Sequence, residues 1–131
     1  MTELQRVYYV EDEADIRFIA DIALRQVGGL EVLISSEGET AIKDIEEFHP
    51  QLILLDVMMP GLDGPTTLEM IRSDERFAHI PAIFLTAKVQ EDEVAYFKGL
   101  GAIGVIAKPF SPMTLADEIK HLWQLSQSAD S

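Results

Sequence analysis

Residues 52–60 read LILLDVMMP, and this stretch places a carboxylate at the end of the most hydrophobic run in the chain. Four apolar residues precede Asp56, and the three residues after it are apolar again. A charge beside buried apolar residues costs free energy unless another group pairs with it. The run therefore predicts a buried strand, and the partners of Asp56 should lie elsewhere in the chain.

Further short apolar runs have the length and the β-branched or aromatic content of strands. These runs are VYYV (7–10), VLI (32–34), AIFL (82–85) and IGVIA (103–107). Segments with the helical spacing of apolar residues separate the runs, so strands and helices alternate along the chain. This alternation predicts an α/β fold, a doubly wound (βα)5 unit with a five-stranded parallel sheet covered on both faces.

Stop and start signals give bounds for several of the expected helices. The first ends at Gly28-Gly29. Its expected apolar face consists of Ile16, Ile19, Ala20, Ala23 and Val27. The second begins with a capping box, Ser36 and Glu39, and stops at His49-Pro50. The last begins with Ser111 as N-cap and with proline in its first turn.

Length and composition favour one globular domain. The 131 residues suit a single core, and we expect the domain to span 5–125, followed by a short tail over 126–131. The net charge of −13 argues against direct contact with nucleic acid. We find no apolar run that is long enough to enter a membrane, and no signal peptide. Cysteine is absent, which excludes disulfides and thiolate metal sites and fits a cytoplasmic location.

Polar residues follow the strands at the point where each strand ends. They are Glu11 and Asp12 after the first strand, Asp56 after the third, Thr86 after the fourth and Lys108 after the fifth. In a parallel α/β sheet the ligand site lies beyond the carboxyl ends of the strands. One rim of the sheet is therefore expected to collect three carboxylates, one hydroxyl and one ammonium.

This set of groups suits phosphoryl chemistry. Crowded carboxylates repel one another unless a cation lies between them, and oxygen ligands without cysteine or paired histidines favour Mg²⁺, with Mn²⁺ as an alternative. Such an ion leaves room for phosphate oxygens, to which Lys108 would offer a charge and Thr86 a hydroxyl. Asp56 can then act as the attacking carboxylate and form an aspartyl-phosphate.

Each residue taken alone also has a simpler interpretation. Asp56 could cap a helix, and the acidic run over 11–13 could be a solvated cluster at a helix N-terminus. Thr86 could cap a loop, and Lys108 could be an ordinary surface ammonium. Their conjunction at one edge of one sheet favours the functional interpretation.

Motifs in four segments resemble the receiver domain of two-component response regulators. The segments are VYYVEDE (7–13), LILLDVMMPGLDG (52–64), IPAIFLTAK (80–88) and GAIGVIAKPF (101–110). The resemblance covers roughly residues 5–125, and the stand-alone chemotaxis regulators are the nearest type. It implies the flavodoxin-like strand order 2-1-3-4-5 and a role in signal transduction or a phosphorelay.

The resemblance also implies roles for the rim residues. Asp56 would be the phosphoacceptor, and its donor would be a histidine kinase or a histidine phosphotransfer protein. Lys108 would contact the phosphoryl group, its bond to Pro109 would be cis, and Thr86 would be the switch hydroxyl.

The metal site implied by the resemblance holds Mg²⁺. Its ligands would be Glu11, Asp12, Asp56 and the main-chain carbonyl of Met58.

The implied output surface comprises the fourth helix, the strand over 103–107 and the last helix. It would contact a downstream protein target or an output domain of the same protein. Receivers commonly carry Tyr or Phe three residues before the lysine, where this chain has Val105. Because valine has no ring to rotate, we expect backbone movement after Thr86 and at the start of the fourth helix to carry the switch.

These features predict a switch with slow autodephosphorylation rather than a metabolic enzyme. A phosphatase of the haloacid-dehalogenase type would need a second carboxylate where this chain has Met58. A pseudo-receiver that only docks is a second alternative, to which Val105 gives some support. A flavodoxin-like cofactor binder would need a phosphate loop where this chain reads EDEAD. Whether the chain is stand-alone or part of a longer protein stays open, as do its kinase, target and oligomeric state.

Overall fold

The computed structural model describes residues 3–129, and within them five parallel strands form one sheet. The strands are β1 (Arg6–Val10), β2 (Glu31–Ser35), β3 (Leu52–Asp56), β4 (Ala82–Thr86) and β5 (Gly104–Ala107). Their order is β2-β1-β3-β4-β5, and every neighbouring pair is parallel. This topology confirms the doubly wound fold predicted from the sequence and the strand order implied by the family resemblance.

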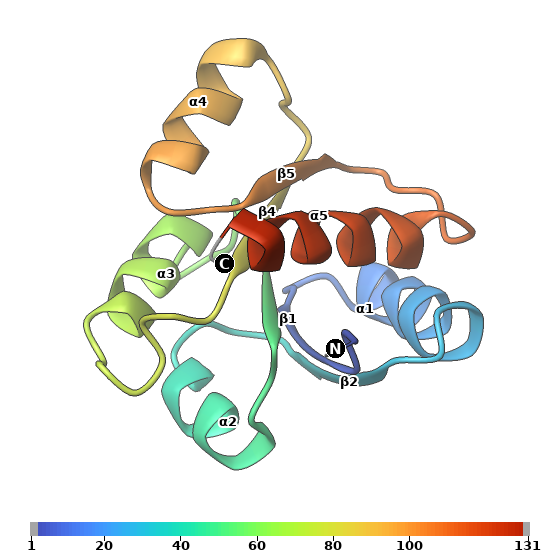
Figure 1. The fold of residues 1–131 in the computed structure, drawn as a ribbon, viewed down its shortest axis with the longest axis horizontal. Coiled ribbons are helices and arrows are strands. Elements are labelled where there is room, and N and C mark those ends of the chain that lie inside the picture. Colours follow the sequence, from blue (N-terminus) through green and yellow to red (C-terminus); the bar gives the residue numbers. More distant parts are fainter. Residues whose placement is uncertain (1–2, 130–131) are drawn as a thin grey trace.

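Helices cover both faces of the sheet, as Figure 1 shows. The helical segments are α1 (Ala14–Asp21), η1 (Ile22–Val27), α2 (Ala41–Phe48), α3 (Gly64–Arg72), α4 (Glu91–Gly99) and α5 (Leu115–Ala129). One face packs against α1, η1 and α5, and the other against α2, α3 and α4. Within the described part of the chain, no helix is both long and apolar enough to cross a membrane.

Alternation along the strands divides the core into two clusters. In β3, Leu52 and Leu54 join the cluster beneath α1 and α5, whereas Ile53 and Leu55 join the cluster beneath α2, α3 and α4. All five residues of β3 are buried, including Asp56 at its end. A strand buried on both faces explains why the sequence shows a continuous apolar run rather than an alternating one.

The first helix presents only part of the apolar face that its sequence predicts: Ala20 and Ala23 are buried as expected. Ile19 and Val27 are 40% and 43% exposed, and Leu24, which the pattern omitted, is fully buried. A change from α-helix to π-helix at Ile22 explains why Leu24 is buried and Val27 exposed, whereas Ile19 precedes this change. The wider i→i+5 turn shifts the helical register, so residues spaced for an α-helix leave the buried side. The predicted stop at Gly28-Gly29 is confirmed, with Gly29 at a φ of 69°.

Two expected helix starts are wrong. Residues 36–39 form no capping box, because α2 begins at Ala41 with Thr40 as N-cap and no side-chain capping bond. The main-chain N–H of Ala41 bonds instead to the carbonyl of Gly38, so a turn precedes the helix.

At the last helix, Ser111 is not the residue that immediately precedes the first turn. Residues 112–114 form a turn in which the N–H of Leu115 donates to the Ser111 carbonyl, and α5 begins at Leu115. At its other end α5 continues to Ala129, through most of the segment expected as a tail, and residues 130–131 lie outside the described residues.

Candidate functional site

The predicted site residues meet at the carboxyl ends of the strands. Glu11 and Asp12 directly follow β1, and Lys108 directly follows β5. Asp56 and Thr86 are the last residues of β3 and β4, one position earlier than the sequence pattern suggested. Because β1, β3, β4 and β5 lie side by side, their ends form one continuous rim.

Lys108 joins two buried carboxylates at this rim. Its Nζ lies 2.9 Å from Oε1 of Glu11 and 3.1 Å from Oδ2 of Asp56. Glu11 is fully buried and Asp56 is 3% exposed. Removing these charges from water is costly, and the short contacts to the ammonium offset part of that cost. Glu11 and Lys108, which are 97 positions apart in the sequence, thus meet at the rim where the sequence analysis expected both.

The carboxylates also form a cluster suited to a cation. One oxygen from each of Glu11, Asp12 and Asp56 lies within 4.8 Å of the others. Among the described residues, Oδ1 of Asp12 is buried and has no hydrogen-bond partner. A buried polar atom without a partner requires an explanation, and hard carboxylate oxygens are the donors that Mg²⁺ prefers. The residues present therefore fit the expected divalent ion.

Burial and mutual charge change the pKa values of the three central groups. Burial, followed by the negative charge of Glu11, raises the pKa of Asp56 to about 7. Burial acts in the same direction on Glu11, but hydrogen bonds, led by that from Lys108, lower its pKa overall. Burial would lower the pKa of Lys108, yet the two carboxylates raise it. Glu11 and Lys108 therefore form an ion pair, whereas burial and the charge of Glu11 disfavour ionisation of Asp56.

Tyr9 belongs to the site, although the sequence analysis did not identify it. Its hydroxyl donates to Oε1 of Glu11 at 2.9 Å, and the Glu13 N–H donates to Oε2 at 3.3 Å. Burial, and then the charge of Glu11, raises the pKa of Tyr9 far above its usual range, so the hydroxyl stays a donor. The signal was present in the sequence, because residues two apart in a strand share a face.

Thr86 occupies the rim beside a region free of aromatic rings on β5. Its side chain is buried, its Oγ1 accepts the N–H of Lys88 at 3.2 Å, and its carbonyl accepts the N–H of Lys108 at 2.9 Å. Val105 is half-buried against the core beneath α4. In that core the rings of Phe84 and Phe97 lie 5.0 Å apart and connect β4 to α4.

The loop that follows Asp56 returns closely to the phosphoacceptor candidate. Gly64 donates its N–H to the carbonyl of Val57 at 3.1 Å, and Asp63 caps α3 by accepting the N–H of Thr66 at 2.8 Å. A Cβ on Gly64 would lie only 2.4 Å from the carbonyl oxygen of Asp56. The side chain of Met58, within this loop, is 78% exposed.

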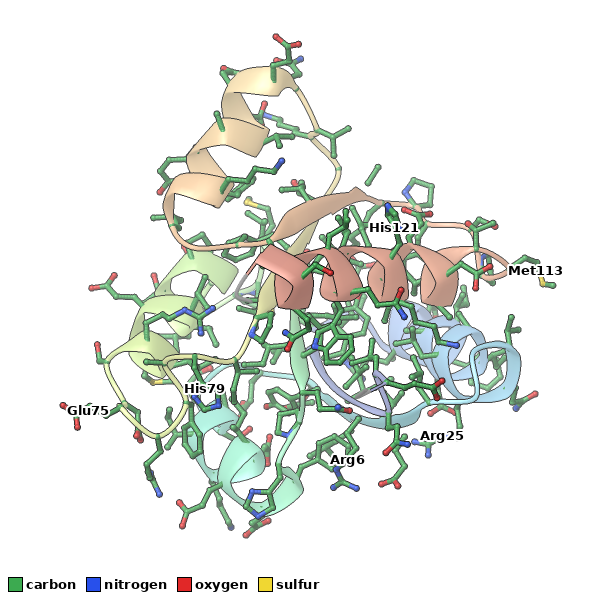
Figure 2. All side chains as sticks on the ribbon, in the orientation of Figure 1. Arg6, Arg25, Glu75, His79, Met113 and His121 are labelled. Carbon is green, nitrogen blue, oxygen red and sulfur yellow. The ribbon has the colours of Figure 1, made fainter. Side chains whose placement is uncertain are left out.

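The histidines lie apart from one another. Figure 2 shows His79 on the segment between α3 and β4 and His121 on α5. His49 ends α2 with a positive φ of 56°. No histidine of the described chain joins the acidic cluster.

Comparison with known proteins shows which family this chain resembles. The sequence model of the protein family described as the response regulator receiver domain matches residues 7–120. The chain is 37% identical over 125 residues to the phosphate regulon transcriptional regulatory protein PhoB of Pseudomonas aeruginosa, covering 95% of this chain and 54% of that protein. It is 32% identical over 119 residues to the DNA-binding response regulator MtrA of Mycobacterium tuberculosis, covering 91% and 50%. The chain spans about half the length of these relatives.

Solved structures with the same fold include other response regulators. The chemotaxis protein CheY4 of Vibrio cholerae superimposes with a TM-score of 0.83 at 26% identity, covering 91% of this chain and 98% of that one. A response regulator from Desulfuromonas acetoxidans gives 0.81 at 26% identity, covering 92% and 98%. The family model covers most of the chain, and both sets of relatives are response regulators. The chain therefore belongs to the receiver-domain family of two-component response regulators.

Proposed function

We propose that this chain is a Mg²⁺-dependent, phosphorylation-activated receiver that accepts a phosphoryl group on Asp56 and then changes its protein contacts. One observation carries the proposal: Asp56 is buried 3.1 Å from Lys108 and within the same oxygen cluster as Glu11 and Asp12. The donor would be a histidine kinase or a histidine phosphotransfer protein, in keeping with the family.

The residues have distinct parts in the proposed transfer. A carboxylate oxygen of Asp56 attacks phosphorus. The bond between phosphorus and the donor's leaving group breaks, and the leaving group keeps the electron pair of that bond. Lys108 lies 3.1 Å from Oδ2 of Asp56, close enough to stabilise the charge that gathers on the transferred oxygens. Its simultaneous contact with Glu11 holds the ammonium at the rim.

The metal would be held by this chain's own oxygens. Glu11, Asp12, Asp56 and the main-chain carbonyl of Met58 are the proposed ligands, with Mg²⁺ as the ion and Mn²⁺ as an alternative. When bound, the ion neutralises negative charge on the carboxylates and on the phosphoryl group. The unpartnered Oδ1 of Asp12 supports this assignment.

The proposed reaction is that of a switch, with autodephosphorylation as its only hydrolysis. Receiver domains are phosphoacceptor switches rather than classical enzymes. A docking-only pseudo-receiver has no need of a complete set of rim groups, and this chain keeps Asp56, Lys108, Thr86 and the acidic pair together. Because position 58 is methionine, the phosphatase alternative lacks its second carboxylate.

The proposed partners contact α4, β5 and α5. The ring contact between Phe84 and Phe97 connects β4 to α4, and within α4 Phe97 contacts the exposed ring of Tyr96. The recipient would be a downstream protein or an output domain in the same polypeptide. Since the net charge is −13, we place nucleic-acid contact outside this domain, and the family supports a cytoplasmic location.

Incubation of the chain with a small acyl phosphate tests the proposed function. With Mg²⁺ present, intact-mass spectrometry should show the addition of one phosphoryl group, and excess chelator should suppress it. Absence of labelling from both a small donor and a histidine phosphotransfer protein would refute the proposal.

Replacement of Asp12 tests the metal site. Mg²⁺ should raise the melting temperature of the parent by mass action, and Asp12→Asn should reduce that increase strongly because one oxygen ligand loses its charge. Without Mg²⁺, Asp12→Asn should melt higher than the parent, since it removes carboxylate repulsion. Differential scanning calorimetry across a Mg²⁺ titration measures both effects.

Asp15→Asn is the matched control for Asp12→Asn, because Asp15 is a nearby exposed acid in the first turn of α1. It should respond to Mg²⁺ as the parent does. Identical responses of Asp12→Asn and the parent would contradict the metal assignment.

Replacement of Thr86 tests the switch. Beryllofluoride mimics the phosphoryl group, and in the parent it should produce large amide chemical-shift changes over residues 86–97. Thr86→Ala should shrink these changes, because the hydroxyl that moves toward the added charge is gone. Thr67→Ala removes another buried threonine hydroxyl, which donates to the Asp63 carbonyl, and should leave the pattern intact. Unaltered distant shifts in Thr86→Ala, with the complex still formed, would mean that another group is the switch.

A further inference from the structure

Two consecutive tyrosines on β1 have nearly identical environments on opposite faces of the sheet. Both side chains are fully buried, and each hydroxyl donates to a carboxylate. Tyr8 reaches Oδ2 of Asp44 on α2 at 2.7 Å, and Tyr9 reaches Oε1 of Glu11 at 2.9 Å. The Tyr8 bond connects the strand to a helix, whereas the Tyr9 bond ends on a carboxylate of the rim.

The hydrogen bond from Tyr9 determines which oxygen of Glu11 remains available to a further ligand. Oε1 of Glu11 receives two donors, the Tyr9 hydroxyl and the Lys108 ammonium, each at 2.9 Å. Among residues 3–129, Oε2 accepts one longer bond, from the Glu13 N–H at 3.3 Å, so this oxygen keeps spare acceptor capacity. Two donors on one oxygen hold the carboxylate against rotation, with the other oxygen left for a further ligand.

The same hydrogen bond bears on Lys108. Without the tyrosine, Glu11 would be free to turn toward the ammonium with both oxygens, and a paired carboxylate competes poorly for a cation. With it, Lys108 keeps a contact to Oδ2 of Asp56 at 3.1 Å as well as one to Glu11. The tyrosine thus separates the part of Glu11 that binds the lysine from the part available to a metal.

We propose that Tyr9 is a positioning residue that orients Glu11 so that the carboxylate binds a divalent cation and Lys108 at the same time. The inference rests on the proposed function, because it assigns Tyr9 to the metal site of that function. Partners that orient a metal-binding side chain from behind it typically contribute 10–100-fold to metal affinity. In this role Tyr9 acts through Glu11 and requires no contact with the phosphoryl group.

Tyr9→Phe removes only the hydroxyl, and we expect it to weaken Mg²⁺ binding by roughly 10-fold or more. Isothermal titration calorimetry with MgCl₂ on the unphosphorylated chain measures the affinity directly. Tyr8→Phe is the control, since it also deletes one buried hydroxyl bonded to a carboxylate, on the adjacent residue. It should destabilise the fold in urea unfolding yet leave the Mg²⁺ affinity unchanged.

A double-mutant cycle with Glu11→Gln separates positioning from a general loss of stability. If Tyr9 acts through Glu11, Tyr9→Phe should cause no additional loss of Mg²⁺ affinity in the Glu11→Gln background. Phosphorylation of Tyr9→Phe by a small acyl phosphate should reach the parental rate once Mg²⁺ is raised to saturation.

The possible results distinguish this inference from the proposed function. The role of Tyr9 is overturned if Tyr9→Phe binds Mg²⁺ as tightly as the parent does, or if Tyr8→Phe loses as much Mg²⁺ affinity as Tyr9→Phe. In either case the proposed function stands as long as the parent binds Mg²⁺ and becomes labelled. A parent that neither binds Mg²⁺ nor becomes labelled overturns both. Loss of affinity in Tyr9→Phe alone, absent in the Glu11→Gln background, supports the inference.

Discussion

Asp56→Asn should abolish phosphoryl labelling of the chain by a small acyl phosphate. The amide has no carboxylate oxygen to attack phosphorus, and the remaining rim carboxylates are committed to other contacts: Glu11 pairs with Lys108, and Asp12 is proposed to bind the metal. The variant should stay folded, because burial already disfavours the charged form of Asp56 and raises its pKa to about 7. Intact-mass spectrometry measures the labelled fraction, and circular dichroism checks the fold.

Asp117→Asn is the matched control for this loss, since it removes one exposed carboxylate from the first turn of α5. It should label as fully as the parent. Equal labelling of Asp56→Asn and the parent would remove Asp56 from the role of phosphoacceptor. Peptide mapping would then locate the acceptor that replaces it.

Gly64→Ala should lower the free energy of unfolding strongly, although it adds only one methyl group. The new Cβ would lie 2.4 Å from the carbonyl oxygen of Asp56 and 3.0 Å from the Cα of Val57, and both neighbours are main-chain atoms. Main chain at the end of a buried strand cannot turn aside as a flexible side chain can. Overpacking of this kind typically costs about 1–3 kcal/mol, and we expect the upper end of that range. Urea unfolding measures the change.

Gly99→Ala gives the opposite expectation and serves as its control. Gly99 ends α4, and a Cβ there would meet nothing within 4 Å. Because alanine is favoured over glycine in a helix, this change should be neutral or stabilising by up to about 1 kcal/mol. If Gly64→Ala unfolds at the same urea concentration as the parent, the loop after β3 moves freely. That result would contradict the close approach of this loop to Asp56.

The sequence predicted the fold and the rim because both follow from the order of residues along the chain. Apolar runs such as 52–55 and 82–85 become strands wherever helices on both sides can cover them. In a parallel sheet all strands point the same way, so residues that end the strands meet at one edge. The sequence therefore places Lys108 and Glu11 at the same rim, and the structure adds that they form an ion pair at 2.9 Å.

Helix starts and helix register were predicted less well. A capping box at 36–39 and an N-cap at Ser111 are local signals whose contribution is about 1 kcal/mol each. The packing of α2 and α5 against the sheet outweighs them, and the helices begin instead at Ala41 and Leu115. In the first helix, the π-helical turns from Ile22 to Val27 bury Leu24 and leave Val27 exposed. Its packing against β2 and α5 is known only from the folded chain.

What the sequence determined by itself is the identity and the gathering of the rim groups, since strand direction alone brings Glu11, Asp56 and Lys108 together. The tertiary structure decided which atoms touch. The spacing of two residues at the end of β1 predicts that Tyr9 and Glu11 lie on one side, but only the folded chain brings the hydroxyl 2.9 Å from Oε1. Likewise, only the path of the loop places Gly64 against the Asp56 carbonyl. Hydrogen bonds and steric contacts change within a few tenths of an ångström, a precision that residue patterns do not carry.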